Sequence, residues 1–346
     1  MVETLISPDR PTVVLDGPEP REFSKLTRTS VTGNGILAGK MGPLVRDCAA
    51  SGQPHRKVVT LPDGCEKRMV AVPVLGPSGH VHAASVWVGS KNDDLPAIPK
   101  VGAIEWSPSG IVTTTPAAHY LLQLPPGEPP NGHTIPELLS RFDYWGDRAS
   151  FLSMFNLAHP TDRWIGTATT TYDDGIDHHL CIAARASGPR MSRTIRAIVF
   201  EVVANDSTPE PDPCALAFRQ IPVPAGHALA LADLWSGFVH EWLAEEHTPL
   251  AGWRHHQPDL DDDSRLLAAS TCFELATGQQ TEANTPARVR FSPEGQWIAL
   301  NAKWTRIRGR GRPQALIDIA PSSTDPVSFI RGCQICYDLS RPQPDH

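Results

Sequence analysis

The sequence lacks the long apolar stretch that a membrane-spanning helix needs. No run of about 18 apolar residues occurs anywhere in the 346-residue chain. The first residues, MVETLISPDRP, contain no basic region followed by an apolar stretch, so they do not predict a secretory signal. The seven cysteines are an odd number and are scattered, which is typical of reduced thiols. We therefore expect a cytoplasmic protein without membrane insertion.

The sequence also lacks the short motifs of common enzyme classes. It has no phosphate-binding glycine loop, no G-x-S-x-G and no H-E-x-x-H. A kinase, cyclase or helix-turn-helix output domain has no room in this chain. The net charge of −7 disfavours nucleic acid as a partner. We therefore expect no catalytic residue, no metal and no cofactor, and a function that depends on binding.

Proline is the feature that the sequence has in excess. The chain contains 34 prolines, about twice the average share. Because proline interrupts helices and central strands, the composition predicts many short elements joined by loops. Hydrophobic residues at 40% and charged residues at 20% indicate folded domains, and a chain of this length suits two or three of them.

Three stretches share the pattern of strand, tight turn and strand. The turns lie at residues 76–79, 107–110 and 292–295, and each has proline at its second position and glycine at its fourth. This is the residue preference of a type I turn. The flanking residues are rich in valine, isoleucine, tryptophan and threonine, which favour strands. Each stretch therefore predicts an antiparallel hairpin.

Two polar, proline-rich stretches, at residues 91–96 and 205–213, predict domain boundaries. The predicted fold class is α+β, with three tandem small modules whose antiparallel sheets are flanked by helices. We expect four parts: residues 1–92, 97–204, 214–321, and a C-terminal helix and tail over 322–346.

Two helix starts are well marked. Thr134 and Glu137 form a capping box, in which each side chain satisfies a backbone amide at a helix start. A second helix is expected over residues 261–277, because three aspartates suit the positive end of a helix dipole. Four apolar residues line one face of this helix: Leu266, Ala269, Phe273 and Ala276.

The segment 97–204 resembles a PAS domain. The sequence motifs that carry this resemblance are IEWSPSG at 104–110, the apolar pair at 121–122, LLSR at 138–141 and LAHPTDR at 157–163. The segment 214–321 resembles a second, divergent PAS domain. The segment 1–92 is similar to a GAF domain through its VPV hairpin at 72–74 and the turn that follows.

As a whole, the chain is similar to the mycobacterial and actinobacterial sensor-only proteins that join one GAF domain to two PAS domains without an effector. That resemblance implies a non-enzymatic signalling protein. Such a protein would bind an unidentified small-molecule signal, a separate signalling protein that carries the output, or both, and would integrate or scaffold signal transfer.

Two other functions stay open. A small hydrolase or redox enzyme could use His255, His256 and the aspartates that follow, or the C-x-x-C formed by Cys333 and Cys336. We interpret the histidines as part of a polar loop ahead of a helix cap, and the cysteines as two thiols on a docking helix. The second alternative is an interaction scaffold that binds no ligand.

Several other polar residues have a structural interpretation. Arg306, Arg308, Arg310 and Arg312 could contact RNA or phosphate, but no aromatic ladder accompanies them, so we interpret them as a solvated hairpin loop. His178 and His179 alternate on a strand, so they should not share a metal. His159 could ligate haem, but because Pro160 follows it we interpret it as a cap of local backbone.

Overall fold

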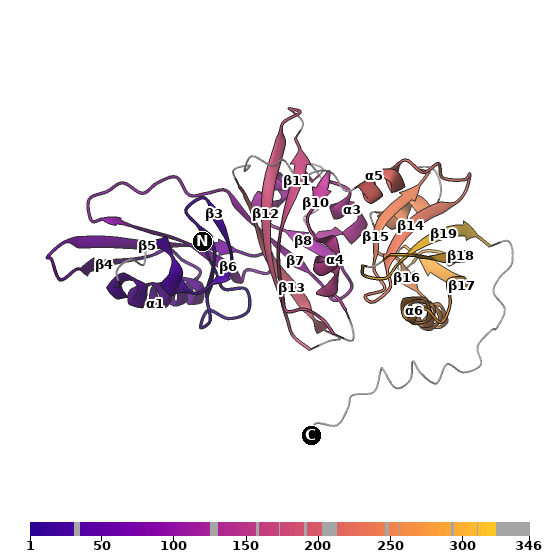
Figure 1. Cartoon of the computed structure of the whole chain (residues 1–346), viewed down its shortest axis with the longest axis horizontal. Coiled ribbons are helices and arrows are strands. Elements are labelled where there is room, and N and C mark those ends of the chain that lie inside the picture. The colour runs from indigo at the N-terminus through magenta and orange to yellow at the C-terminus, as the bar shows by residue number, and fades with distance from the viewer. Residues whose placement is uncertain are drawn as a thin grey trace, which may run out of the picture. The chain divides into compact units, whose positions relative to one another are not determined.

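The structure is a computed structural model. It describes residues 1–322, except for 31–34, 125–130, 157–158, 173, 190–191, 203–212, 246–248, 255, 292–293 and 310. Three antiparallel sheets, of six, seven and six strands, form most of it (Figure 1). Strands account for 43% of the structure and helices for 22%.

The expected α+β class is therefore wrong, because the chain is mostly β. Among the described helices only α1 (Gly35–Ser51) and α6 (Asp262–Thr277) are longer than seven residues. Two of the short ones, α2 (Pro116–Leu121) and α3 (Ile135–Leu139), carry proline in their first turn. The abundant proline and the many tight turns favour hairpins at the expense of helices that could flank each sheet.

The chain divides into two compact units. The first unit comprises Met1–Gly132, Arg141–Met154 and Thr161–Asp212. The second comprises His133–Ser140, Phe155–Pro160 and Pro213–His346. The division into four parts that the sequence suggested stays a prediction.

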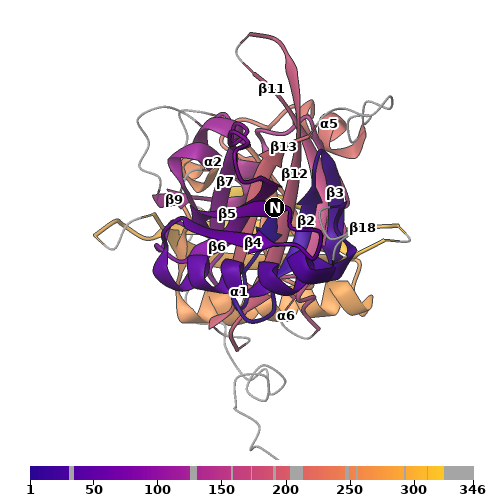
Figure 2. The same ribbon diagram turned by 90° about the vertical axis from the view of Figure 1, so that its left-hand side faces the viewer.

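The first sheet of the first unit is covered on one face by α1, which runs across β4, β5 and β6 (Figure 2). Leu37, Met41, Leu44, Val45 and Cys48 recur at helical spacing and are buried against the sheet. The sheet order is β3 (Glu19–Ser24), β2 (Thr12–Asp16), β1 (Val2–Glu3), β6 (Val81–Ser90), β5 (Glu66–Leu75), β4 (His55–Thr60). A short 3-10 turn, η1, spans Leu26–Arg28.

The second sheet completes the first unit, together with α2 and α4 (Arg148–Ser153). Its strand order is β10 (Tyr144–Trp145), β11 (Arg163–Thr171), β12 (Asp177–Ser187), β13 (Thr194–Glu201), β7 (Val101–Trp106), β8 (Val112–Thr114), β9 (Asn131–His133).

The predicted hairpins are confirmed. β5 pairs with β6 around the turn at 76–79, where Gly79 N–H donates to the Gly76 carbonyl at 2.9 Å. β7 pairs with β8 around the turn at 107–110, where Gly110 N–H donates to the Ser107 carbonyl at 2.9 Å. In the second unit β17 (Glu282–Arg290) pairs with β18 (Ile298–Ile307), although part of the connecting turn lies outside the described residues.

Aromatic rings fill the region between the second sheet and α4. Trp145 and Trp164 stack with ring centroids 5.4 Å apart, and Phe151 of α4 meets both rings edge-on. Trp106 contacts Phe151 in the same way, at 5.4 Å. These side chains form a packed aromatic core between the sheet and the helix.

Apolar residues and two ion pairs join the first and second sheets. Ala83 of the first sheet and Cys181, Ala183 and Ile198 of the second belong to one buried cluster. Glu3 in the first sheet accepts hydrogen bonds from Leu5 N–H and from Arg185 Nε of the second, each at 2.9 Å. Burying this carboxylate is tolerated because it is paired with a cation.

The second ion pair links His82, which is fully buried, to Glu105. The two ring nitrogens of His82 face oxygen atoms: Nδ1 lies 3.1 Å from the Ala197 carbonyl, and Nε2 lies 2.9 Å from Glu105. An imidazolium satisfies both contacts by donating from both nitrogens. The ring covers Gly76, where a Cβ atom would lie 2.1 Å from Nε2, so only glycine fits in this turn.

The third sheet forms the core of the second unit with α6 packed on one face. Its order is β15 (Val239–Ala244), β14 (Ala228–Asp233), β19 (Gln314–Pro321), β18 (Ile298–Ile307), β17 (Glu282–Arg290), β16 (Asp259–Leu260). Alongside it lie α3, α5 (Pro213–Arg219) and the 3-10 helix η4 (Pro249–Arg254). The predicted helix start at Thr134 is confirmed, since its hydroxyl accepts from Glu137 N–H at 3.2 Å.

The helix α6 begins where the sequence predicted, but it buries a different face. Asp261 caps it by accepting from Ser264 N–H at 2.9 Å. Its buried residues are Ser264, Thr271, Cys272, Leu275 and Ala276. Of the apolar residues that the sequence places on one face, Ala276 is buried, whereas Leu266 is 50% exposed and Phe273 is 38% exposed.

Hydrogen bonds explain the orientation of α6. The Ser264 hydroxyl accepts from Arg288 N–H at 2.8 Å, and the Thr271 hydroxyl lies 3.1 Å from that of Thr285. Both partners lie on β17, so small hydroxyl side chains hold the helix against that strand. None of the helices in the described ranges is long and apolar enough to cross a lipid bilayer.

The ion pair of Glu105 generates a prediction about acid stability. Burial raises the pKa of Glu105, but hydrogen bonds from His82 and Ser78 and the charges of His82 and Arg196 outweigh it, so the pKa lies below the usual 4.5. A lowered pKa means that the carboxylate stabilises the fold above about pH 4.5, and that this contribution is lost as the pH falls through the folded-state pKa.

We expect Glu105→Gln to lower the free energy of unfolding at pH 7 by on the order of 2 kcal/mol. The difference from the parent protein should shrink below about pH 4.5. Urea unfolding at several pH values measures both effects. Glu66→Gln is the control, because its pair with Lys91 is exposed and should contribute less than about 1 kcal/mol. Equal effects of the two substitutions would contradict the prediction.

Candidate functional site

A buried aspartate organises one end of the third sheet. Asp233, at the end of β14, has no exposed surface. Its carboxylate accepts hydrogen bonds from the backbone N–H of Ser236 at 2.7 Å and from the Ser236 hydroxyl at 2.5 Å. Gly237 N–H donates to the Asp233 carbonyl at 2.8 Å. These bonds determine the course of the loop between β14 and β15, which carries Trp235.

The same carboxylate also holds the loop between β18 and β19. Arg312 forms a two-pronged ion pair with Asp233, in which Nη2 donates to Oδ2 at 2.8 Å and Nε donates to Oδ1. Leu234 N–H donates to the Pro313 carbonyl at 3.1 Å. Because β14 and β19 are neighbours in the sheet, these contacts close the two loops against each other.

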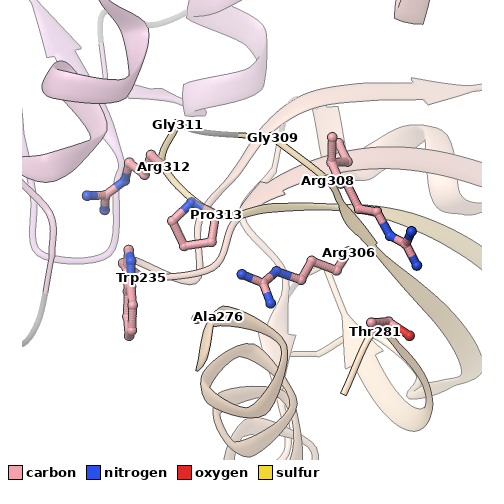
Figure 3. A pocket seen from close by; sticks show the side chains of 10 residues that line it. Trp235, Ala276, Thr281, Arg306, Arg308, Gly309, Gly311, Arg312 and Pro313 are labelled. Carbon is pink, nitrogen blue, oxygen red and sulfur yellow. The ribbon is translucent and has the colours of Figure 1, made fainter. Parts of the chain in front are cut away.

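A pocket of about 340 Å³ lies between these loops and the C-terminal end of α6 (Figure 3). Its charged lining residues are all arginines, of which Arg312 is paired with Asp233. The lining residues are Trp235, Ala276, Thr281, Arg306, Ile307, Arg308, Gly309, Gly311, Arg312 and Pro313.

Arg306 is the arginine that points into the pocket. Figure 3 shows its side chain reaching from the strand toward Trp235, across the end of α6, whereas Arg308 and Arg312 point away on opposite sides. Arg306 lies at the end of β18, on the face that packs against α6, as the buried Ala302 and Trp304 also do. In the described part of the chain, no ion pair or hydrogen bond of the Arg306 side chain is found.

The end of α6 leaves room for this guanidinium. Gly278 caps the helix with φ 80°, and a Cβ atom there would lie 2.5 Å from Nη1 of Arg306. A cation next to a helix C-terminus is stabilised by the helix dipole, so Arg306 also supports α6. The dipole carries only a fraction of a charge, and a guanidinium has five N–H donors. Arg306 therefore keeps charge and donors for an anion.

The chemistry of the pocket suits a small anion with a flat apolar part. A guanidinium forms paired hydrogen bonds with carboxylate or phosphate oxygens. The indole of Trp235, on the opposite side of the pocket in Figure 3, offers a surface for a planar group.

The interpretation of the arginines as a solvated loop needs correction. They do lie at a hairpin between β18 and β19, but Arg312 is mostly buried in its ion pair and Arg306 is half-buried in the pocket. Arg310 lies outside the described residues. Sequence reasoning missed Asp233 and Trp235, which are more than 70 positions from the arginines and share no motif with them.

Only some of the residues considered for an enzyme lie in the described part of the chain. Cys333, Cys336 and His255 lie outside the described residues. His256 is exposed, Asp259 pairs with Arg290 at 3.2 Å, and Asp261 is the cap of α6. Among the described residues no group of three or more histidines, cysteines or carboxylates is arranged to hold a metal ion.

The three other histidines that the sequence singled out, His159, His178 and His179, contact different partners. His178 contacts Glu201 at 2.6 Å and stacks on Tyr172, whereas His179 lies 3.0 Å from the Thr169 hydroxyl. The backbone N–H of His159 donates to the Asn156 side chain at 3.4 Å, which is a local contact.

Comparison with known proteins relates the chain to a mycobacterial protein. Residues 1–97 match the family model described as Rv3651-like, N-terminal. The chain is also similar to a crystal structure of an uncharacterised protein from Mycobacterium tuberculosis, with a TM-score of 0.69 and 19% identity. The match covers 93% of this chain and 95% of the other. The two proteins thus share a fold, whereas the GAF and PAS assignments are not confirmed.

Other similarities are much weaker. An RNA-binding light-oxygen-voltage receptor matches with a TM-score of 0.24 and 10% identity, over 64% of this chain and 95% of its own. The sensor domain of the Vibrio cholerae histidine kinase DctB matches with a TM-score of 0.18 and 10% identity, over 64% and 72%. Similarities with TM-scores this low say nothing about the fold or the function of this chain. No curated protein matches the chain.

The thiols generate a prediction about reactivity. Burial raises the pKa of Cys48 to about 11 and the pKa values of Cys181 and Cys272 to about 12, and Asp233 adds to the shift of Cys272. A thiol reagent at pH 7.5 should therefore leave these three residues unmodified until the protein is denatured. Cys65 is exposed and should react in the native protein. Peptide mass mapping tests this, and native labelling of Cys272 would contradict it.

Proposed function

We propose that this chain is a non-enzymatic, cytoplasmic protein of sensor type that binds a small anionic molecule in the pocket between Trp235 and Arg306. A separate signalling protein would carry the output. Neither nucleic acid nor membrane insertion is part of this proposal. The GAF and PAS character of its parts belongs to the same proposal and rests on the sequence resemblance.

The observation that carries the proposal is the difference between two neighbouring arginines. Arg312 is neutralised by Asp233, whereas Arg306 points into the pocket with no carboxylate partner in the described part of the chain. A half-buried cation without a counter-charge favours an anion from solution, because part of its hydration is already lost. The indole of Trp235 adds an apolar surface, which an organic anion contacts and an inorganic ion does not.

Binding is favoured over catalysis by the chemistry of the same pocket. A catalytic site needs a nucleophile or an acid–base pair held near the reacting group. The lining offers guanidinium groups, which do not give up a proton near neutral pH. It also offers the hydroxyl of Thr281, but no histidine, lysine or carboxylate among the lining residues to accept the proton of that hydroxyl. The buried thiol of Cys272 has a raised pKa, so it is not activated.

Titration calorimetry with benzoate and inorganic phosphate tests the proposal. We expect benzoate to bind and benzamide, its uncharged counterpart, to bind at least about tenfold more weakly, which corresponds to roughly 1.4 kcal/mol. Arg306→Ala should weaken benzoate binding by a similar factor. Arg306→Lys should restore part of it, because it keeps the charge but loses the flat geometry.

Lys303→Ala is the matched control, because Lys303 lies on the same strand but points to the other side of the sheet. Circular dichroism should show that each variant is folded, since Arg306 also supports α6. If no anion binds, or if Arg306→Ala and Lys303→Ala behave alike, the pocket is not the binding site. Turnover of a substrate that is abolished by replacing His256 would favour the enzyme alternative.

A further inference from the structure

Backbone carbonyls at the C-terminal end of α6 keep the capacity to accept hydrogen bonds. The last turn of a helix leaves carbonyls without a partner inside the helix. The residues that cap α6 donate to the carbonyls of Glu274 and Leu275, at 2.9 and 3.2 Å. Across the described residues, the carbonyls of Ala276 and Thr277 receive no such bond. The end of α6 therefore offers two acceptors to a donor from outside the chain.

These carbonyls belong to the helix end that borders the pocket. Ala276 is one of the lining residues, and Figure 3 shows Arg306 passing across the end of the helix. A Cβ atom at Gly278 would lie 2.5 Å from Nη1 of Arg306, so the guanidinium and the helix end are close together. Helix carbonyls point toward the C-terminal end and give it about half a negative charge. The pocket thus presents a full positive charge beside a partial negative charge.

This pair of charges is better matched by a zwitterion than by a simple anion. A carboxylate is attracted to Arg306, but the negative end of the helix repels it. A ligand with an ammonium group next to its carboxylate gains from both charges, because the ammonium donates to the carbonyls. An α-amino acid carries these two groups on one carbon atom. The indole of Trp235 offers its surface to a flat side chain on the same carbon.

We propose that the pocket binds a free α-amino acid with an aromatic side chain. The carboxylate pairs with Arg306 and the ring lies against Trp235. The ammonium donates to the carbonyls of Ala276 and Thr277. This inference rests on the proposed function and narrows its ligand from an anion to a zwitterion. Residues inside a peptide chain do not meet the requirement, because their amino and carboxyl groups are uncharged amides.

Titration calorimetry of the full-length protein with three compounds that share a phenyl ring and a two-carbon chain tests the inference. Phenylalanine carries both charges, 3-phenylpropionate only the carboxylate and phenethylamine only the ammonium. We expect phenylalanine to bind at least about threefold more tightly than 3-phenylpropionate, because the contact of the ammonium with the helix end is added. Phenethylamine should bind more weakly than both, because Arg306 repels it.

A charge placed at the helix end tests the role of the carbonyls. Gln279→Lys adds a cation next to them at an exposed position, and a lysine there can donate to the last carbonyls of a helix. The preference for phenylalanine over 3-phenylpropionate should therefore fall toward one. Leu266→Lys is the matched control, because it adds the same charge at an exposed position about three turns away on α6. It should leave the preference unchanged, and circular dichroism should show that both variants are folded.

The outcomes separate this inference from the proposed function. Equal binding of phenylalanine and 3-phenylpropionate, lost in Arg306→Ala, would overturn the amino acid as ligand and leave the anion site intact. If neither these compounds nor benzoate bind, both proposals fall. Phenylalanine binding that Arg306→Ala leaves unchanged would place the amino acid outside this pocket. The same preference in Gln279→Lys and Leu266→Lys would contradict the contact with the helix carbonyls.

Discussion

The carboxylate of Asp233 is the contact on which the second unit's pocket depends. It is fully buried, and a buried charge is tolerated only when it is paired and hydrogen-bonded. Arg312 provides the pair and Ser236 the hydrogen bonds, so one side chain determines the course of two loops. Because the Asp233 carboxylate holds both loops in place, Trp235 and Arg306 face the same cavity.

The first unit uses buried ion pairs for a different purpose. Glu3 with Arg185 and His82 with Glu105 connect its two sheets, alongside the apolar cluster between them. Buried pairs contribute little net stability compared with apolar residues of the same size, but leaving one charge without its partner is costly. We therefore interpret these pairs as determinants of how the sheets are aligned, with the apolar contacts supplying most of the stabilisation.

The helix α6 connects the pocket to the surface. Its buried side is held to β17 by hydroxyl groups, its C-terminal end forms one side of the pocket, and its outer side exposes Leu266, Ala269 and Phe273. A ligand at Arg306 would change the charge beside the end of a helix whose other side is available for contact.

Residue type and spacing were enough to predict the local features of this protein. The turns at 76–79 and 107–110, the helix start at Thr134 and the cap at Asp261 follow from contacts among residues at most four positions apart, and the structure contains all of them. Such contacts depend on residue type and spacing, which a sequence displays directly.

Only the tertiary structure decided the fold class, the buried face of α6 and the composition of the pocket. Asp233 and Arg312 are 79 positions apart, and neither belongs to a recognisable motif. The apolar spacing of Leu266, Ala269 and Phe273 does not mark the buried face of α6. The side of the helix that packs on β17 carries Ser264, whose hydroxyl accepts from Arg288 N–H, and Thr271. Contacts between distant segments depend on how the sheets and loops assemble. The spacing of residues within one segment does not reveal that assembly.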